Sequence, residues 1–155
     1  MMKDIHNCTR MLKEPGYLCN LMGLYESNYA RLHQLLPNGI KAAANAQWIL
    51  KSPRHLDLSL RVERVSRCVL SLEMNYIFYR PDDDCYLAPR LEIRVYNDAR
   101  LAEAVNCHKY RDSPPKSSLY NLPSMLAYRW RINVLLNKWL DQALQQHYRS
   151  EHQKP

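Results

Sequence analysis

Cysteine and histidine, which can both bind zinc, occur close together at two places in the chain. Cys107-His108 forms one pair and His6-Asn7-Cys8 forms the other. Strong zinc sequences show paired ligands at repeated short spacings, and these two pairs do not. A Cys107 nucleophile with His108 as its base is also disfavoured, because adjacent strand residues point to opposite faces. The sequence therefore predicts neither a metal site nor a catalytic residue at these pairs.

Three consecutive acids, Asp82-Asp83-Asp84, could hold magnesium through oxygen ligands. Acids in a loop that begins with proline more often serve turn formation and solubility. The chain has no GxGxxG, P-loop or GxSxG motif, and only three glycines, which disfavours a phosphate-cradling loop. We expect no metal and no cofactor. An enzyme acting on a small acidic metabolite is the second alternative function.

Four polar residues in the two predicted helices could form a network or contact a ligand: Glu26, Asn28, Asn133 and Asn137. Asn133 and Asn137 lie one helical turn apart and therefore on the same side. Buried amides need hydrogen-bond partners, so a structural network between helix and sheet is one interpretation. Contact with a ligand is the other.

The segment Tyr128-Arg129-Trp130-Arg131 predicts a surface for a partner. Trp130 and Val134 are one turn apart and lie beside the main apolar stripe of their helix, with Arg129 and Arg131 on either side of Trp130. Tryptophan and arginine are typical anchors of protein interfaces. We therefore expect a protein partner or self-association here. The alternative is that the N-terminal arm or the 112–123 segment packs over this patch.

Nucleic acid is a competing partner. Arg61, Arg64 and Arg67 could line a sheet that also offers tyrosines for stacking. Acids in the same strands, among them Glu63 and Glu73, dilute this positive charge. An RNA- or DNA-binding protein is therefore the first alternative to a protein-binding adaptor.

Two helices must position the polar residues and the Trp130 patch. Apolar residues recur at three- and four-residue steps over residues 17–36, between Pro15-Gly16 and Pro37-Asn38-Gly39. A second helical stripe follows the breaker-rich 112–123 segment, with Ser124 as its expected N-cap. The stripe contains Tyr128, Ile132, Leu135, Leu136, Trp139, Leu140, Ala143 and His147.

Between the helices the apolar period changes to two, which is typical of strands. The strand patterns are Leu56 to Val62 and Cys68 to Phe78, which we expect to pair as a hairpin turning near Val65-Ser66. Residues 45–50 could add an edge strand, and residues 80–89 are predicted to form a loop.

The segment 91–105 predicts a further hairpin that turns at Asn97-Asp98. A two-residue loop would place Leu91, Ile93 and Val95 on the face of Arg100, Ala102 and Ala104. A three-residue loop would instead place them beside Leu101, Glu103 and Val105. The alanines would allow a helix to approach closely, whereas Glu103 on an apolar face would need a partner. Both alternatives remain open from the sequence.

The 155-residue chain has the size of one domain, expected to have its core at about 17–148 and flexible ends. Its composition is globular, and no apolar run is long enough to span a membrane. Five cysteines lack the spacing of a disulfide framework, and the N-terminus lacks a signal-like apolar stretch. These features predict a cytoplasmic protein. Of the net charge of +7, residues 41–80 carry +4 and residues 121–155 carry +3.

Residues spread over 17–148 resemble the YqiB-like bacterial proteins, a family of unknown function numbered 1249. The matching residues are Glu26, Asn28, Tyr29, Leu32, Pro37, Tyr96, Asp98, Ala99, Asn133, Trp139 and Leu140. The chain departs from the pattern at Asn97, where such proteins typically have histidine. The resemblance implies a bacterial, cytoplasmic setting and no known reaction. We predict an α+β fold in which an antiparallel meander of four to five strands is packed by an N-terminal and a C-terminal helix.

Overall fold

The structure is a computed structural model that describes residues 17–36, 38–40, 45–79, 85–108 and 122–150. Its elements are α2 (Tyr17–Leu35), β1 (Ala46–Lys51), β2 (Asp57–Arg64), β3 (Val69–Tyr79), β4 (Cys85–Tyr96), β5 (Leu101–His108), α3 (Leu122–Gln145) and β6 (Arg149–Ser150). The expected N-terminal arm and the residues after Ser150 lie outside the described residues, as do residues 112–121 of the expected connection.

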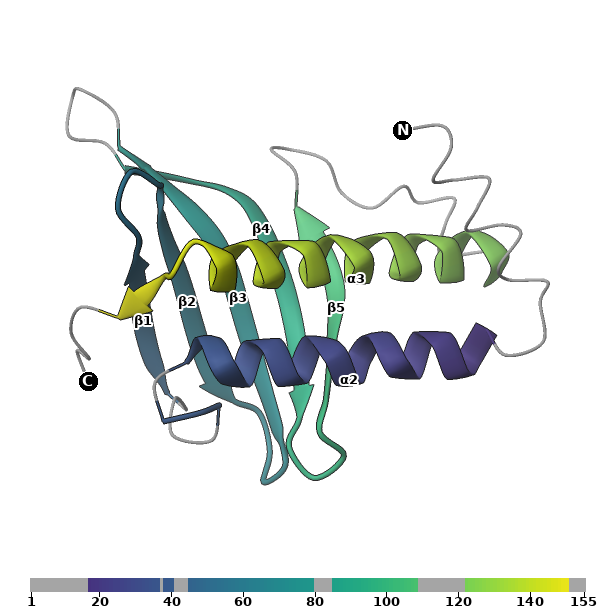
Figure 1. The fold of residues 1–155 in the computed structure, drawn as a ribbon. Helices are drawn as coiled ribbons and strands as arrows, with labels where there is room; N and C mark the ends of the chain where they lie inside the picture. The colour runs from purple at the N-terminus through teal and green to yellow at the C-terminus, as the bar shows by residue number, and fades with distance from the viewer. Residues whose placement is uncertain (1–16, 37, 41–44, 80–84, 109–121, 151–155) are drawn as a thin grey trace.

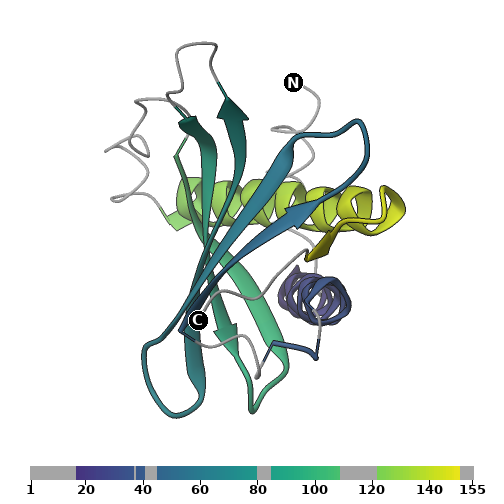
Figure 2. The same ribbon diagram turned by 90° about the vertical axis from the view of Figure 1, so that its left-hand side faces the viewer.

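The strands form one antiparallel sheet in the order β5-β4-β3-β2-β1-β6. Both helices lie on one face of this sheet, and the other face is left open by them (Figures 1 and 2). The predicted α+β meander with flanking helices is therefore confirmed. The sheet has six strands, not four to five, because the two-residue β6 pairs with Leu50 and Lys51 of β1. A strand so short leaves no periodic pattern in the sequence.

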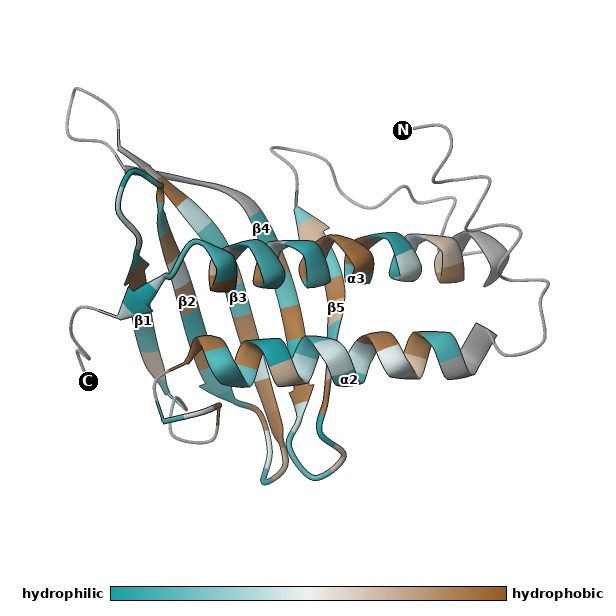
Figure 3. Ribbon diagram, in the orientation of Figure 1, coloured by the Kyte–Doolittle hydropathy of each residue, from teal (hydrophilic) through white to brown (hydrophobic). Residues whose placement is uncertain are grey.

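The core forms where the alternating strands meet the helical stripes (Figure 3). Burying this apolar surface is the main source of stability for such a layer. The fully buried large side chains include Leu58, Leu60, Leu70, Leu72, Met74, Leu91 and Ile93 of the sheet, and Leu32, Leu136 and Leu140 of the helices. Tyr76 of β3 and Trp139 of α3 pack with their rings tilted at 60° and their centroids 5.3 Å apart.

The β4–β5 hairpin has a four-residue loop, 97–100, instead of two or three residues. Arg100 closes the loop with a φ of 55°, in the left-handed region. Side chains alternate between the two faces of a sheet, so a loop of four residues places the same positions on one face as a loop of two. Val95 accordingly pairs with Ala102, and Ile93 pairs with Ala104. The alanines therefore face the core, and Glu103 between them points to the opposite face.

Several predicted boundaries are wrong. Residues 85–89 belong to β4 and not to a loop, while 80–84 lie outside the described residues. Helix α3 begins at Leu122, so Ser124 is inside the helix and not its N-cap. Pro123 fits in the first turn because the amide it lacks would have no intrahelical partner there. Leu56 precedes β2 and is exposed, and His147 follows the end of α3 at Gln145.

Candidate functional site

Side chains from the helices form hydrogen bonds with backbone groups of β5, the strand at the edge of the sheet. The Ala104 amide donates to Asn133 Oδ1 at 2.7 Å, and Asn133 Nδ2 donates to the Ala104 carbonyl at 3.1 Å. The Cys107 amide donates to the hydroxyl of Tyr128 at 3.0 Å, and Asn28 Nδ2 lies 3.4 Å from the Ala102 carbonyl. These bonds replace those that a neighbouring strand would make, and buried backbone groups require such partners.

The same asparagines join the two helices. Asn28 Nδ2 lies 3.3 Å from Asn133 Oδ1, and Asn137 Nδ2 donates to Asn28 Oδ1 at 3.0 Å and to the hydroxyl of Ser27 at 2.9 Å. The structure therefore brings together three of the four polar residues singled out in the sequence. Glu26 is exposed on α2 and outside this network. Because Asn28 and Asn133 are fully buried, this geometry supports the structural interpretation over ligand contact.

Glu103 is a buried carboxylate that lies where both helices approach β5. The Tyr96 hydroxyl donates to Glu103 Oε1 at 2.7 Å, and Arg129 Nη1 lies 3.5 Å from Glu103 Oε2. Burial, followed by the Glu103 charge, raises the pKa of Tyr25 to about 12, while Arg129 acts in the opposite direction. Glu103 thus has partners from β4 and α3, which a charge at this depth requires.

A second polar chain crosses β4 and β5 and reaches α3. His108 Nε2 lies 3.0 Å from Glu92 Oε1 and 3.2 Å from Asn106 Nδ2, and the Tyr128 hydroxyl donates to Asn106 Oδ1 at 3.0 Å. Cys107 instead packs in the core, so it and His108 point apart as strand alternation predicts. Desolvation raises the pKa of Tyr128 above its ordinary value.

Among the described residues, no group of three or more His, Cys, Asp or Glu side chains could hold a metal ion. His6, Cys8 and Asp82-Asp83-Asp84 lie outside the described residues.

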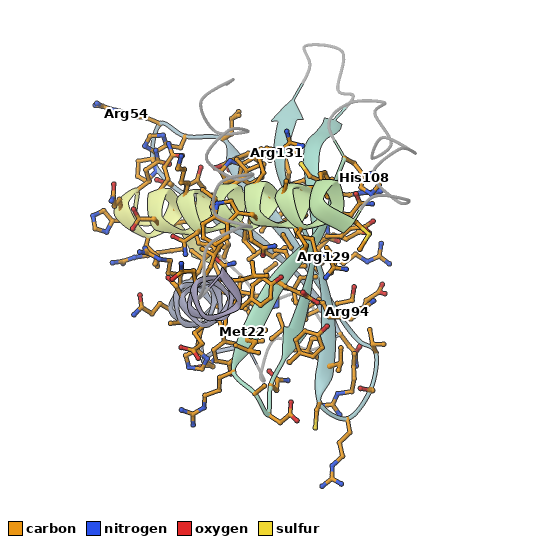
Figure 4. All side chains as sticks on the ribbon, turned by 90° about the vertical axis from the view of Figure 1, so that its right-hand side faces the viewer. Met22, Arg54, Arg94, His108, Arg129 and Arg131 are labelled. Carbon is orange, nitrogen blue, oxygen red and sulfur yellow. The ribbon has the colours of Figure 1, made fainter. Side chains whose placement is uncertain are left out.

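The residues of the predicted partner surface have different surroundings in the structure. Trp130 packs against a small cluster formed by Leu21 and Tyr25, so α2 covers part of it. Residues 1–16 and 112–121, which the sequence offered as cover for this patch, lie outside the described residues. Arg129 reaches Glu103, whereas Arg131 lies over the Tyr128 ring at 5.9 Å from its centroid. Figure 4 shows the two arginines projecting from opposite sides of α3.

The N-terminal parts of both helices extend past β5 (Figure 1), and α3 crosses toward the open side of the sheet (Figure 4). We call residues 17–25 of α2 and 122–131 of α3 the helix overhang. None of the seven residues 125–131 is buried, although Met125, Leu126, Ala127, Tyr128 and Trp130 are apolar or aromatic. A helix that is apolar on most sides is normally buried, so this partial exposure is unusual. Val134, one turn after Trp130, is also partly exposed.

The arginines proposed for nucleic acid do not form a separate basic track. Arg61 Nη2 lies 3.0 Å from Glu63 Oε1, and both side chains are more than half exposed. Arg64 ends β2, and its amide donates to Asn45 Oδ1 at 3.1 Å, while Arg67 lies exposed in the following turn. The charges here are exposed and mixed in sign.

Comparison with protein families finds one match, to the family described as "Protein of unknown function (DUF1249)", over residues 31–149. The chain belongs to this family. The DUF1249 match begins within α2 and ends at the first residue of β6, so it includes β1 to β5 and α3 but not the α2 part of the helix overhang. No curated protein and no solved structure matches the chain significantly. No helix among the described residues is long and apolar enough to cross a membrane.

Sequence reasoning missed the roles of Tyr96 and Tyr25 beside Glu103. The available signal was Glu103 itself, a charge between Ala102 and Ala104 in a strand. Its partners come from β4 and the helices, and their positions depend on tertiary packing that periodicity does not describe.

Proposed function

We propose that this protein is a non-catalytic binding protein that recognises a partner protein through the helix overhang. The supporting observation is that residues 125–130, which are mostly apolar, are all only partly buried, and that Arg131 is exposed. In the same helix, Ile132, Leu136, Leu140 and Ala143 are buried. Exposed apolar surface next to polar residues is typical of protein interaction sites.

The charges of the helix overhang indicate the chemistry of the partner. Residues 17–25 contain no charged side chain, and residues 125–131 contain Arg129 and Arg131 but no acid. Arg94 of β4 is exposed on the same side as Arg129 (Figure 4). A partner with apolar anchors beside carboxylates would complement this surface, and charge complementarity favours correct encounters.

A second copy of the chain is a poorer fit. A two-fold symmetric dimer places the same surface patch on both subunits, so the arginines of one copy would meet a patch in which residues 125–131 likewise contain arginines and no acid. Like charges brought together in this way oppose association. The proposal is therefore a different, acidic protein and not self-association.

Site-specific photocross-linking in living cells tests the proposal. Met22, which is 42% exposed, would carry the cross-linker on the helix overhang, and Lys138, exposed nearer the C-terminal end of α3, would carry it in the control. We expect one protein to be cross-linked from Met22 and not from Lys138, through an acidic segment.

The cross-linked protein is then purified, and its affinity is measured for the wild type, for Arg131→Glu with Val134→Asp, and for a Lys138→Glu control. We expect about 10-fold or greater weakening in the first variant alone, equivalent to about 1.4 kcal/mol. Cross-linking to residues 1–16 of the same chain, cross-linking to a second copy, or equal affinities of all three proteins would contradict the proposal.

We also propose a bacterial cytoplasmic setting for this function. The sequence resemblance is to bacterial proteins, and the five cysteines lack the spacing of a disulfide framework. The absence of such a framework is typical of proteins in a reducing compartment.

A further inference from the structure

A cluster of basic residues lies at the opposite end of α3 from the helix overhang. We call it the basic end, and it consists of Lys51, Arg54, His55, His147 and Arg149, all of them exposed. The cluster draws on the two chain segments, 41–80 and 121–155, that carry most of the net positive charge. Lys51 Nζ lies 4.0 Å from Asp57 Oδ2.

Specific contacts hold the two segments of the basic end together. Strands β1 and β6 pair through Leu50 with Ser150 and Lys51 with Arg149. The Tyr148 hydroxyl donates to the Leu56 carbonyl at 2.6 Å, and the Ser52 hydroxyl donates to the Gln146 carbonyl. The turn that carries Arg54 and His55 is therefore fixed against the end of α3.

Two features of the basic end oppose stability. Lys51 and Arg149 are direct cross-strand partners, and like charges in that position destabilise a sheet. Arg54 has a φ of 65°, in the left-handed region that residues with a side chain rarely adopt. Backbone strain of this kind concentrates at functional sites.

We propose that the basic end binds the phosphodiester backbone of a nucleic acid. Guanidinium, ammonium and imidazole groups are the usual donors to phosphate oxygens, and backbone contacts of this type need no base-specific residues. The proposal does not depend on the partner-binding function, because the two surfaces lie at opposite ends of α3.

An anionic membrane is the less favourable occupant. Stable membrane attachment needs apolar side chains that insert, or a cluster of about four to eight Lys and Arg residues. The basic end has three such residues, Lys51, Arg54 and Arg149, and one exposed large apolar side chain, Leu56 at 44%. Three permanent cations are enough for weak, salt-dependent binding to phosphates.

Fluorescence anisotropy with a labelled single-stranded RNA and a labelled DNA duplex tests this inference. If three phosphates are neutralised, affinity falls about 40-fold for the duplex and about 20-fold for the single strand between 50 and 200 mM salt. The two probes distinguish which nucleic acid is preferred.

A matched pair of variants locates the binding surface. Lys51→Gln with Arg54→Gln and Arg149→Gln removes three charges from the basic end, and Arg61→Gln with Arg64→Gln and Arg67→Gln removes three from β2 and its turn. We expect at least 10-fold weaker binding and a flatter salt dependence in the first variant, and near wild-type binding in the second. Far- and near-ultraviolet circular dichroism verifies that both variants fold.

The inference is overturned if the wild type binds neither probe at 50 mM salt, or if the two variants lose affinity equally. It is also overturned if the wild type binds vesicles containing anionic lipid but not the nucleic acids. If the first variant fails to fold, the double variant Lys51→Gln with Arg149→Gln takes its place. Its loss of affinity is then compared with that of the double variant Arg61→Gln with Arg64→Gln.

Discussion

The two halves of α3 have similar apolar content but different surroundings. In the C-terminal half, Leu136 and Leu140 are fully buried against the sheet, whereas in the N-terminal half Leu126 and Trp130 pack against the small cluster of Leu21 and Tyr25 and remain partly exposed. The difference follows from position, because the N-terminal half extends past β5.

The two halves of α3 differ in how much each contributes to the stability of the fold. Burial of apolar area is the main favourable contribution to folding, so the half over the sheet carries most of the stability contributed by α3. The exposed half contributes less to the fold, and its sequence can therefore be adapted to a partner. Variants that are matched between the two halves test this division.

The same substitution in each half should have the largest difference in effect. Leu136→Ala removes a fully buried side chain and leaves a cavity, so we expect a loss of about 3 kcal/mol in the free energy of unfolding. Leu126→Ala should cost about 1 kcal/mol, because Leu126 is partly exposed. Urea denaturation followed by circular dichroism measures both, and equal losses would contradict the division.

Asparagines on the boundary between the halves should give an intermediate effect. Asn133→Ala leaves the amide and carbonyl of Ala104 without their side-chain partner, so we expect a loss of about 2 kcal/mol. Asn137→Ala should cost about 1 kcal/mol, since Asn137 bonds side chains and is partly exposed. A smaller loss for Asn133→Ala than for Asn137→Ala would show that the edge of β5 does not depend on Asn133.

The smallest expected effect is a loss of stability at high pH that is caused by two buried tyrosines, one from each half of the molecule. Burial is the main cause that raises the pKa of both Tyr25 and Tyr148 from 10.0 to about 12. At a pH between these two pKa values, the phenols of the unfolded chain lose protons that the phenols of the folded chain keep. Stability is therefore full below pH 10 and falls as pH rises toward 12, by about 1 kcal/mol per tyrosine at pH 11.

Tyr25→Phe and Tyr148→Phe should each flatten this decline, as measured by urea denaturation from pH 9 to 11.5. Tyr148→Phe also loses its hydrogen bond to the Leu56 carbonyl, so it should be about 1 kcal/mol less stable already at neutral pH. A decline as steep as that of the wild type in both variants would assign the effect to other groups.

Much of the fold could be predicted from the sequence because its core is periodic. The alternation of Leu58, Leu60 and Val62 and the helical spacing of Ile132, Leu136 and Leu140 locate the buried faces directly. The short β6 and the start of β4 at Cys85 were missed, since neither has a distinctive apolar pattern.

The candidate sites were less predictable because they depend on contacts between distant residues. The sequence singled out Asn28, Asn133 and Asn137 but could not tell a network from a ligand site, which depends on the approach of both helices to β5. The sequence also predicted a basic surface at Arg61. In the structure, the pairing of Lys51 with Arg149 brings positive charges together at another end of the molecule.

Asn133 and Tyr128 also have a consequence for how this protein could misassemble. Because they occupy hydrogen-bonding groups of β5 at Ala104 and Cys107, a strand from another molecule finds few groups to join while α3 stays in place. Conditions that detach α3 without unfolding the sheet would uncover this row of donors and acceptors. Resistance to fibril growth would then depend on how tightly one helix is held, and not on the strand itself.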